Sequence, residues 1–186
     1  MASEFNAHEA GSIPSELAIL PLQDSVLFPN TVMPLAVTKP YGIKLVEDAL
    51  KASAPIGVVA LKNRDASPPA PDDVYTVGTV AIIQKMIKIP DGTLRCIISG
   101  TVPFTATEFT RAEPYLVAKV EPLEEQTTES DELTALSRNL ASQYTRLLAF
   151  LPSAPKELEL EVNNITDPNL LSYFIASTMR LDNAEK

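Results

Sequence analysis

The chain alternates short apolar stretches with prolines and polar turns before it changes to a helical repeat. Residues 17–37 show this most clearly, because polar or proline-containing breaks separate three apolar pieces. Proline cannot donate a backbone hydrogen bond, so Pro21, Pro29 and Pro34 restrict these pieces to strand starts, edges or bulges. Breaks this frequent exclude a helix. The stretch is predicted to be a kinked, curved β-structure with a sizeable apolar surface.

Further runs rich in β-branched residues predict more strands before residue 121. The run at 56–61 is continuously apolar, which is typical of a buried strand. One helix is expected at about 40–52, where apolar side chains recur at helical spacing after Pro40 and Pro55 follows. The remaining strands are expected at residues 77–89, 93–99, 102–110 and 115–120. This density of short strands, about seven in all, indicates a barrel or a sandwich-like sheet.

The pair Asp91-Gly92 lies between two of these strands and favours a tight hairpin. If these are the two central residues of the turn, Lys88 faces Arg95. Like charges directly opposite one another destabilise a strand pair, so either this face is solvated or a bulge shifts the register. An exposed Lys88 and Arg95 would form a local positive spot, for which a solvated edge that blocks association between sheets is the favoured interpretation.

From residue 133 onward the apolar period becomes helical. Ser130 is a plausible N-cap for a helix that should run to about Phe150. Residues 156–162 fit a strand or a helix, and the helix is preferred because Glu and Leu favour it. A last helix should begin at Asp167-Pro168, with a cap followed by proline at the first position. Its predicted buried stripe consists of Leu170, Leu171, Phe174, Ile175 and Met179.

These patterns predict an α+β fold with a β-rich lobe of the barrel type followed by a small helical bundle. The expected divisions are a disordered tail at 1–14, the β-rich lobe at 15–120, an acidic linker at 121–132 and a helical lobe at 133–186. The charge supports the boundary, because residues 1–120 carry a net charge of −2 and the remainder −7, within a total of −9. A negative total speaks against nucleic acid as a main partner.

The composition also limits the compartment and the chemistry. Cys96 is the single cysteine, so an intramolecular disulfide is impossible, and a buried, inert thiol is the favoured interpretation. No apolar run approaches the roughly 18–20 residues that cross a bilayer, and the amino terminus lacks the order of a signal peptide. The expected location is the cytoplasm, without membrane contact.

No constellation of catalytic residues emerges from the sequence. His8 is the single histidine and lies in the expected tail, which argues against a catalytic triad or a histidine metal site. The sequence has no G-x-x-x-x-G-K-[ST] loop. We therefore expect no metal, no cofactor and no enzyme activity of these residues by themselves.

Several motifs resemble the amino-terminal domain of Lon proteases. The order L-P-L-x-D-x-V-x-F-P-x-x-x-x-P-L-x-V over residues 20–37 is similar to the opening of that domain. Three further matches are the segment at 72–81 with Gly78, the sequence PDGT at 90–93, and Asp167-Pro168 with the two leucines that follow. The resemblance covers about residues 15–181. It implies a PUA-like β-lobe followed by an α-helical lobe.

The sequence departs from the family pattern at four places. Asn30 stands where the family often has glycine, and Thr38-Lys39 where it often has Gly-Arg. The arginine of a Gly-x-x-Arg motif is missing at 100–103. The family's Leu-Ala-Asp is Leu171-Ser172-Tyr173 here. The fold expectation survives these changes, but contacts made by that arginine or that aspartate do not carry over.

The resemblance implies a substrate-recognition and assembly domain of a Lon-type ATP-dependent protease. Such a domain would bind unfolded or tagged proteins and would associate with copies of itself in the full-length ring, while ATPase and Ser–Lys protease modules lie elsewhere in the parent protein. Polypeptide can be held by apolar grooves or by an exposed sheet edge. The candidate binding residues are apolar side chains beside breaks in the strands, for each of which a core position is the alternative: Leu27, Phe28, Met33, Met86 and Leu94.

Two other functions are weighed against this one. A standalone Lon-domain adaptor or small-ligand binder, similar to the related domain in cereblon, would need a cysteine-rich zinc domain that one cysteine cannot supply. An enzyme that acts alone has no support in the sequence.

Overall fold

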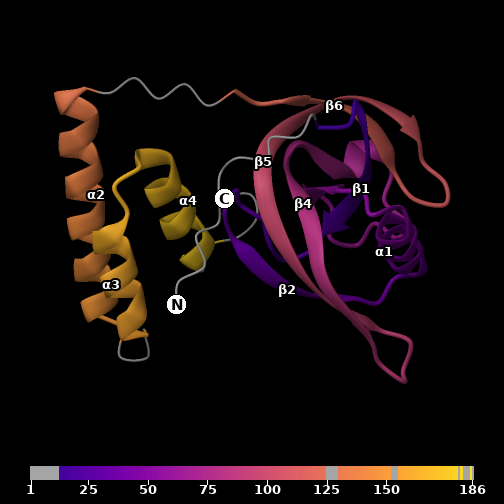
Figure 1. Ribbon diagram of the computed structural model, residues 1–186, viewed down its shortest axis with the longest axis horizontal. Helices are drawn as coiled ribbons and strands as arrows, with labels where there is room; N and C mark the ends of the chain where they lie inside the picture. Colours follow the sequence, from indigo (N-terminus) through magenta and orange to yellow (C-terminus); the bar gives the residue numbers. More distant parts are fainter. Residues whose placement is uncertain (1–12, 125–129, 152–154, 180, 182–184, 186) are drawn as a thin grey trace.

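The structure, a computed structural model, describes residues 13–124, 130–151, 155–179, 181 and 185. It has an α+β fold with a β-rich lobe and a separate helical lobe (Figure 1), which confirms the predicted fold class. Most of the expected tail, residues 1–12, and the middle of the expected linker, residues 125–129, lie outside the described residues.

The described elements follow one another in the order of the two lobes. The β-rich lobe contains β1 (Glu16–Leu22), β2 (Val32–Val37), α1 (Pro40–Ala52), β3 (Ile56–Leu61), a short 3-10 turn (Pro71–Asp73), β4 (Val74–Lys88), β5 (Leu94–Arg111) and β6 (Val117–Pro122). The helical lobe contains α2 (Asp131–Ala149), α3 (Lys156–Asn164) and α4 (Pro168–Thr178).

The six described strands form one sheet in the order β2-β5-β4-β3-β1-β6, and β5 also pairs with β6. Five strands therefore close into a ring, and β2 lies outside it, paired with β5 alone. The pairing of β1 with β3 is parallel and the others are antiparallel. The expected count of about seven strands is too high, because the predicted strands at 93–99 and 102–110 are parts of the single strand β5.

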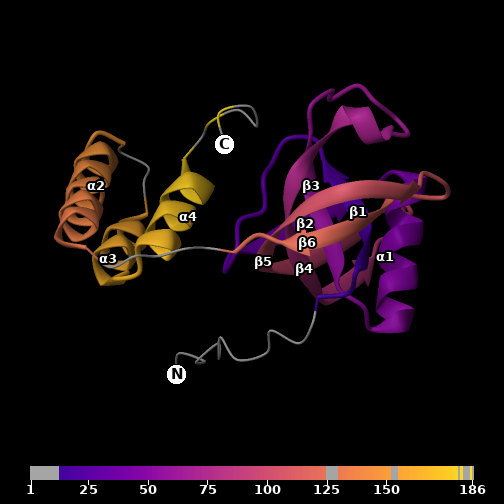
Figure 2. The same ribbon diagram turned by 90° about the horizontal axis from the view of Figure 1, so that it is seen from above.

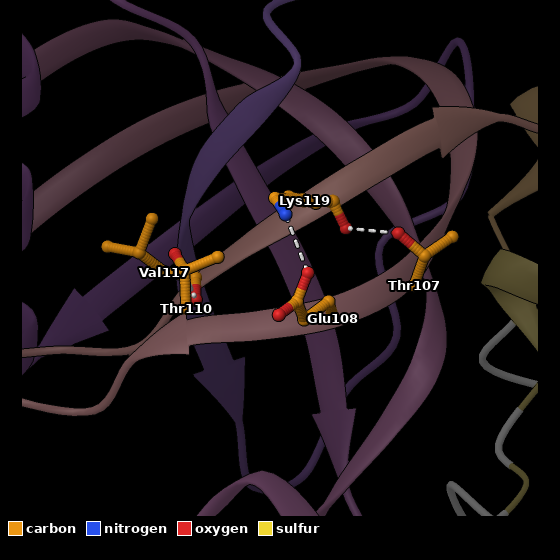
Figure 3. Close-up of polar contacts among 5 residues, drawn as sticks. All are labelled: Thr107, Glu108, Thr110, Val117 and Lys119. Atoms are coloured by element: carbon orange, nitrogen blue, oxygen red, sulfur yellow. Dashed lines mark hydrogen bonds and ion pairs between the residues drawn. The ribbon is translucent and has the colours of Figure 1, made fainter.

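The ring closes where the second half of β5 pairs with β6 (Figure 3). Beside the backbone ladder, the Lys119 Nζ atom lies 2.6 Å from Glu108 Oε2, and the Thr107 hydroxyl donates a 3.3 Å hydrogen bond to the Lys119 carbonyl. This ion pair is exposed to solvent, so the backbone pairing and the apolar interior, more than the charges, hold the ring together.

Inside the ring, Phe104 is fully buried in an apolar cluster contributed by all five strands. Gly78 makes room for it, since a Cβ atom there would lie 3.0 Å from the phenyl ring and 2.3 Å from the Val58 carbonyl oxygen. Close packing therefore requires glycine at position 78.

Helix α1 covers a second cluster on the side of the β-rich lobe that faces away from the helical lobe (Figure 2). Its bounds agree with the predicted 40–52. Pro40 stands in the first turn, and Ser53, with φ of 49°, ends the helix in the left-handed region. Leu45 and Val46 are fully buried against the sheet.

The loop from β1 to β2 is fixed to β4 and β5 by hydrogen bonds. The Thr79 hydroxyl donates a buried 2.7 Å hydrogen bond to the Leu27 carbonyl, and the Asn30 amide donates to the Gly100 carbonyl at 3.1 Å. Asn30 has φ of 56°, a left-handed conformation that asparagine tolerates better than most residues. Asparagine, which stands here where the family often has glycine, therefore fits the left-handed conformation of this loop.

The helical lobe has its own small core, formed by Tyr144, Val162, Leu171 and Ile175. The predicted caps are confirmed: Ser130 accepts from the Leu133 amide, and Asp167 accepts from the amides of the first turn of α4. Residues 156–162 are helical, as preferred. In the predicted buried stripe of α4, Leu170 is an exception, because it is exposed.

None of the described helices has the length and apolar character needed to span a bilayer.

The prediction from this packing is that Phe104→Ala lowers the free energy of unfolding of the β-rich lobe by about 3–5 kcal/mol, since the ring is fully buried and leaves a cavity. Urea unfolding followed by circular dichroism measures the change. Phe109→Ala, at a half-buried position of the same strand, is the control and should cost clearly less. Equal losses for the two variants would contradict this account of the barrel interior.

Candidate polypeptide-binding face

The β4–β5 hairpin extends beyond the ring (Figure 1), and its register differs from that of a two-residue turn at Asp91-Gly92. The Ile89 amide donates to the Thr93 carbonyl at 2.9 Å, so the loop contains three residues, 90–92, and Gly92 adopts φ of 89°. The expected tight hairpin is present, and of the two alternatives left open by the sequence, the shifted register is the one found. Lys88 lies opposite Leu94, and Arg95 lies opposite Ile87, so the like charges do not face each other.

The turn is stabilised by Asp91. Its carboxylate accepts a 2.8 Å hydrogen bond from the Thr93 amide, and this bond holds the pKa of Asp91 below its ordinary value. Proline at 90 sets the first backbone angle of the turn, and only the following glycine takes the positive φ.

A bulge in β4 decides which side chains of the hairpin share a face. Ile83 lies opposite Ile98, whereas Lys85 lies opposite Ile97, so Gln84 is an extra residue on β4. Side chains alternate between the two faces of a strand, so one extra residue reverses the alternation beyond it.

Three rows of side chains result on the side of β2, β5 and β4 that faces away from α1, and we call this surface the outer face. Each row runs across β4, β5 and β2 in turn: Ile82, Ser99 and Val32; Lys85, Ile97 and Pro34; and Ile87, Arg95 and Ala36.

The outer face carries large apolar side chains in solvent. Val32 is 60% exposed, Ile87 54%, Ile82 48% and Ile97 40%. Single exposed apolar residues are ordinary, but these four occupy neighbouring positions of one three-stranded surface. A shallow depression of about 380 Å³ lies beside Ile87 and Ile97, and it is lined by these two residues and by Pro34, Leu35, Ala36, Lys85, Arg95 and Cys96. The outer face can therefore bury apolar groups of a ligand.

The opposite, inner face of the same strands is covered. Met33, Leu35, Ile83 and Met86 pack against the cluster beneath α1, and the Lys88 ammonium lies 3.2 Å from the Glu47 carboxylate of that helix. Both faces of these strands carry apolar residues, but α1 covers only the inner face.

Strand β2 also has a free edge, because within the described residues it pairs with β5 alone. Pro34 lies in the middle of this edge and has no amide hydrogen, which limits continuous pairing with another strand. Side-chain contact with the outer face is therefore better supported than the addition of a full-length strand.

The five predicted binding residues lie elsewhere than on the outer face. Leu27 and Leu94 are 3% and 0% exposed and belong to the core, which is the alternative considered from the sequence. Met33 and Met86 are half-buried on the inner face. The Phe28 ring centroid lies 6.0 Å from that of Tyr173, so Phe28 contacts the helical lobe. Their role in binding remains a prediction.

The sequence does contain a signal for the outer face. Val32-Met33, Ile82-Ile83 and Ile97-Ile98 are pairs of adjacent large apolar residues inside strands. Adjacent strand residues point to opposite faces, so such a pair places one apolar side chain on each face. The five candidate residues were selected because they lie beside breaks in the strands, and this criterion does not detect such pairs.

The thiol of Cys96 is confirmed as buried, and burial raises its pKa, so the thiolate that reacts with electrophiles is disfavoured. In the part of the chain that the structure describes, no group of three or more His, Cys, Asp or Glu side chains is arranged to hold a metal ion.

Residues 16–186 match the sequence family described as the ATP-dependent protease La (LON) substrate-binding domain. The chain is 37% identical over 183 residues to Lon protease of Dictyoglomus thermophilum, which covers 98% of this chain and 23% of the relative. It is 37% identical over 174 residues to Lon protease 1 of Herpetosiphon aurantiacus, covering 91% and 21%. The chain thus spans less than a quarter of the length of these relatives.

Two solved structures are similar in fold. The amino-terminal domain of a Mycobacterium avium complex Lon protease superposes with a TM-score of 0.75 at 20% identity, over 91% of this chain and 86% of that one. A Lon amino-terminal domain protein from Xanthomonas campestris gives a TM-score of 0.53 at 22% identity, over 88% and 98%. At such identities the likeness shows the fold.

The register predicts opposite outcomes for two neighbouring isoleucines. Ile98→Ala should lower the free energy of unfolding by about 2–4 kcal/mol, because Ile98 is fully buried. Ile97→Ala should lower it clearly less, by about 1 kcal/mol or less, because Ile97 is 40% exposed on the outer face. Urea unfolding of both variants measures the difference, and the reverse order would contradict the assignment of the two faces of β5.

Proposed function

The chain belongs to the family of ATP-dependent protease La (LON) substrate-binding domains, and from this premise we propose that it recognises unfolded or tagged proteins for a Lon-type ATP-dependent protease. The match identifies these residues as a substrate-binding domain rather than an ATPase or protease module, in agreement with the sequence. In this proposal capture belongs to the β-rich lobe, residues 15–120, and assembly to the helical lobe, residues 133–186. We place the domain in the cytoplasm, with protein rather than nucleic acid as its ligand.

The observation that carries the capture proposal is the exposed apolar surface of the outer face. An unfolded protein differs from a folded one chiefly in that its apolar side chains are in water. A surface that buries such side chains without a deep, shaped pocket can accept many sequences. The outer face has this character, since it exposes four large apolar residues, two of which, Ile87 and Ile97, line a shallow depression.

The proposal for assembly starts from α2. Three exposed leucines of this helix and its exposed C-cap residue repeat with heptad spacing and lie beside, rather than within, the core of the helical lobe: Leu136, Leu140, Leu147 and Phe150. The acidic residues Asp131 and Glu132 begin the helix and Arg146 lies in its last turn. Two copies of α2 packed antiparallel would join these apolar stripes and bring opposite charges together, so we propose a second copy of the chain as the partner.

For capture, we predict that the triple variant Val32→Ser, Ile87→Ser and Ile97→Ser binds a denatured model protein at least about tenfold more weakly, because burying these side chains supplies the binding free energy. Equilibrium binding of a fluorescent, chemically unfolded protein measures it. Val77→Ser is the control, since Val77 is 54% exposed on β4 but outside the three rows. Unchanged binding by the triple variant would exclude the outer face as the capture site.

For assembly, Leu136→Asn should weaken self-association by about tenfold, because it places an amide in the proposed apolar contact. Sedimentation equilibrium over a range of concentrations measures the association constant. Leu160→Asn on α3 is the matched control, because Leu160 is also exposed but lies outside the stripe. A wild-type chain that stays monomeric at all concentrations, or equal effects of the two variants, would contradict the proposal.

A further inference from the structure

We propose that the outer face selects extended polypeptide segments in which an Asp or Glu side chain lies close to apolar ones. This inference rests on the proposed function and adds a chemical preference to it. Its basis is the position of two cations, Lys85 and Arg95, inside the apolar rows.

Lys85 and Arg95 occupy neighbouring strands and neighbouring rows of the outer face. Lys85 lies opposite Ile97, and Arg95 is two residues before Ile97 on β5. They are thus diagonal neighbours, for which Cα atoms are separated by about 7–8 Å. Both are exposed, and both line the depression together with Ile87 and Ile97. One carboxylate placed in the depression can reach both cations while its neighbours contact the isoleucines.

The surroundings leave these two charges available. Strands β2 and β4 contain no Asp or Glu, and the first carboxylate on β5 is Glu108. Within the described part of the chain neither Lys85 nor Arg95 forms an ion pair. The nearest acidic residue along the chain is Asp91, whose carboxylate accepts from the Thr93 amide and whose pKa Arg95 lowers as a minor cause.

The chemistry of the two cations favours a carboxylate over other ligands. Arginine presents a planar fork of donors that matches a carboxylate, and a hydrogen bond between charged groups is stronger than one between neutral groups. Nucleic acid would require a wider basic surface than two residues, and it would gain nothing from the apolar rows. The combination of apolar rows with two cations therefore fits an acidic, apolar peptide segment.

The test compares three fluorescent peptides with the same leucine-rich sequence, which carry Asp, Asn or Lys at one central position. Fluorescence anisotropy with the complete chain gives each dissociation constant. We expect the Asp peptide to bind about tenfold more tightly than the Asn peptide, and the Lys peptide to bind most weakly. The advantage of Asp should shrink in 0.5 M salt, because salt screens exposed charges.

The double variant Lys85→Gln and Arg95→Gln should abolish the preference for Asp, so that the Asp and Asn peptides bind with equal affinity. Its control is Lys62→Gln with Arg111→Gln, which removes the same two charge types from exposed positions outside the outer face. All four positions are exposed, so these variants should fold, and circular dichroism verifies this.

The outcomes separate the inference from the function on which it rests. Equal affinities for the Asp and Asn peptides, with binding still lost in the Val32, Ile87 and Ile97 triple variant, would overturn the charge preference and leave capture intact. An equal loss of preference in the control variant would also overturn it, because net charge alone would then be the cause. Failure of all three peptides and of unfolded protein to bind would overturn the proposed function as well.

Discussion

The double pairing of strand β5 is the constraint on which the rest of the β-rich lobe depends. Its first part lies between β2 and β4, and its second part lies between β4 and β6. The second pairing closes the ring around Phe104 and leaves none of its five strands with a free edge. The first pairing carries β5 out of the ring as part of a three-stranded extension. Within the described strands, free sheet edges are therefore confined to this extension, and the candidate site lies there for a topological reason.

The extension can bind a ligand because α1 covers only one of its two faces. Helix α1 and its buried leucine and valine side chains close the inner face, while the four large apolar side chains of the outer one stay exposed. Ile98 on the inner face is fully buried and its neighbour Ile97 is 40% exposed. An apolar side chain left in water contributes little to the stability of the folded monomer, so the rows of the outer face are better explained by a ligand.

Features set by local sequence could be predicted, and features set by pairing could not. The cap at Ser130, the Asp167-Pro168 helix start and the helix at 40–52 each depend on a few adjacent residues, and the structure has all three. The bulge at Gln84 arises only when β4 meets β5, and it has no local signature. Because that bulge decides which side chains of β4 lie on each face, the place of Met86 on the inner face could not be predicted from the sequence. Likewise, Tyr173 at the aspartate position of the family pattern could not be read as a partner of Phe28 until the two lobes were placed together.

The overall charge of −9 does not contradict a basic binding face. The surplus of acidic residues lies mainly in residues 121–186, which carry −7, whereas the β-rich lobe is nearly balanced. At physiological salt the Debye length is about 8 Å, so distant carboxylates act weakly on a ligand that touches the outer face. Lys85 and Arg95 act at contact distance and lie beside apolar groups that exclude water. Affinity would then come from apolar contacts that most unfolded proteins can offer, while the two cations would discriminate among them.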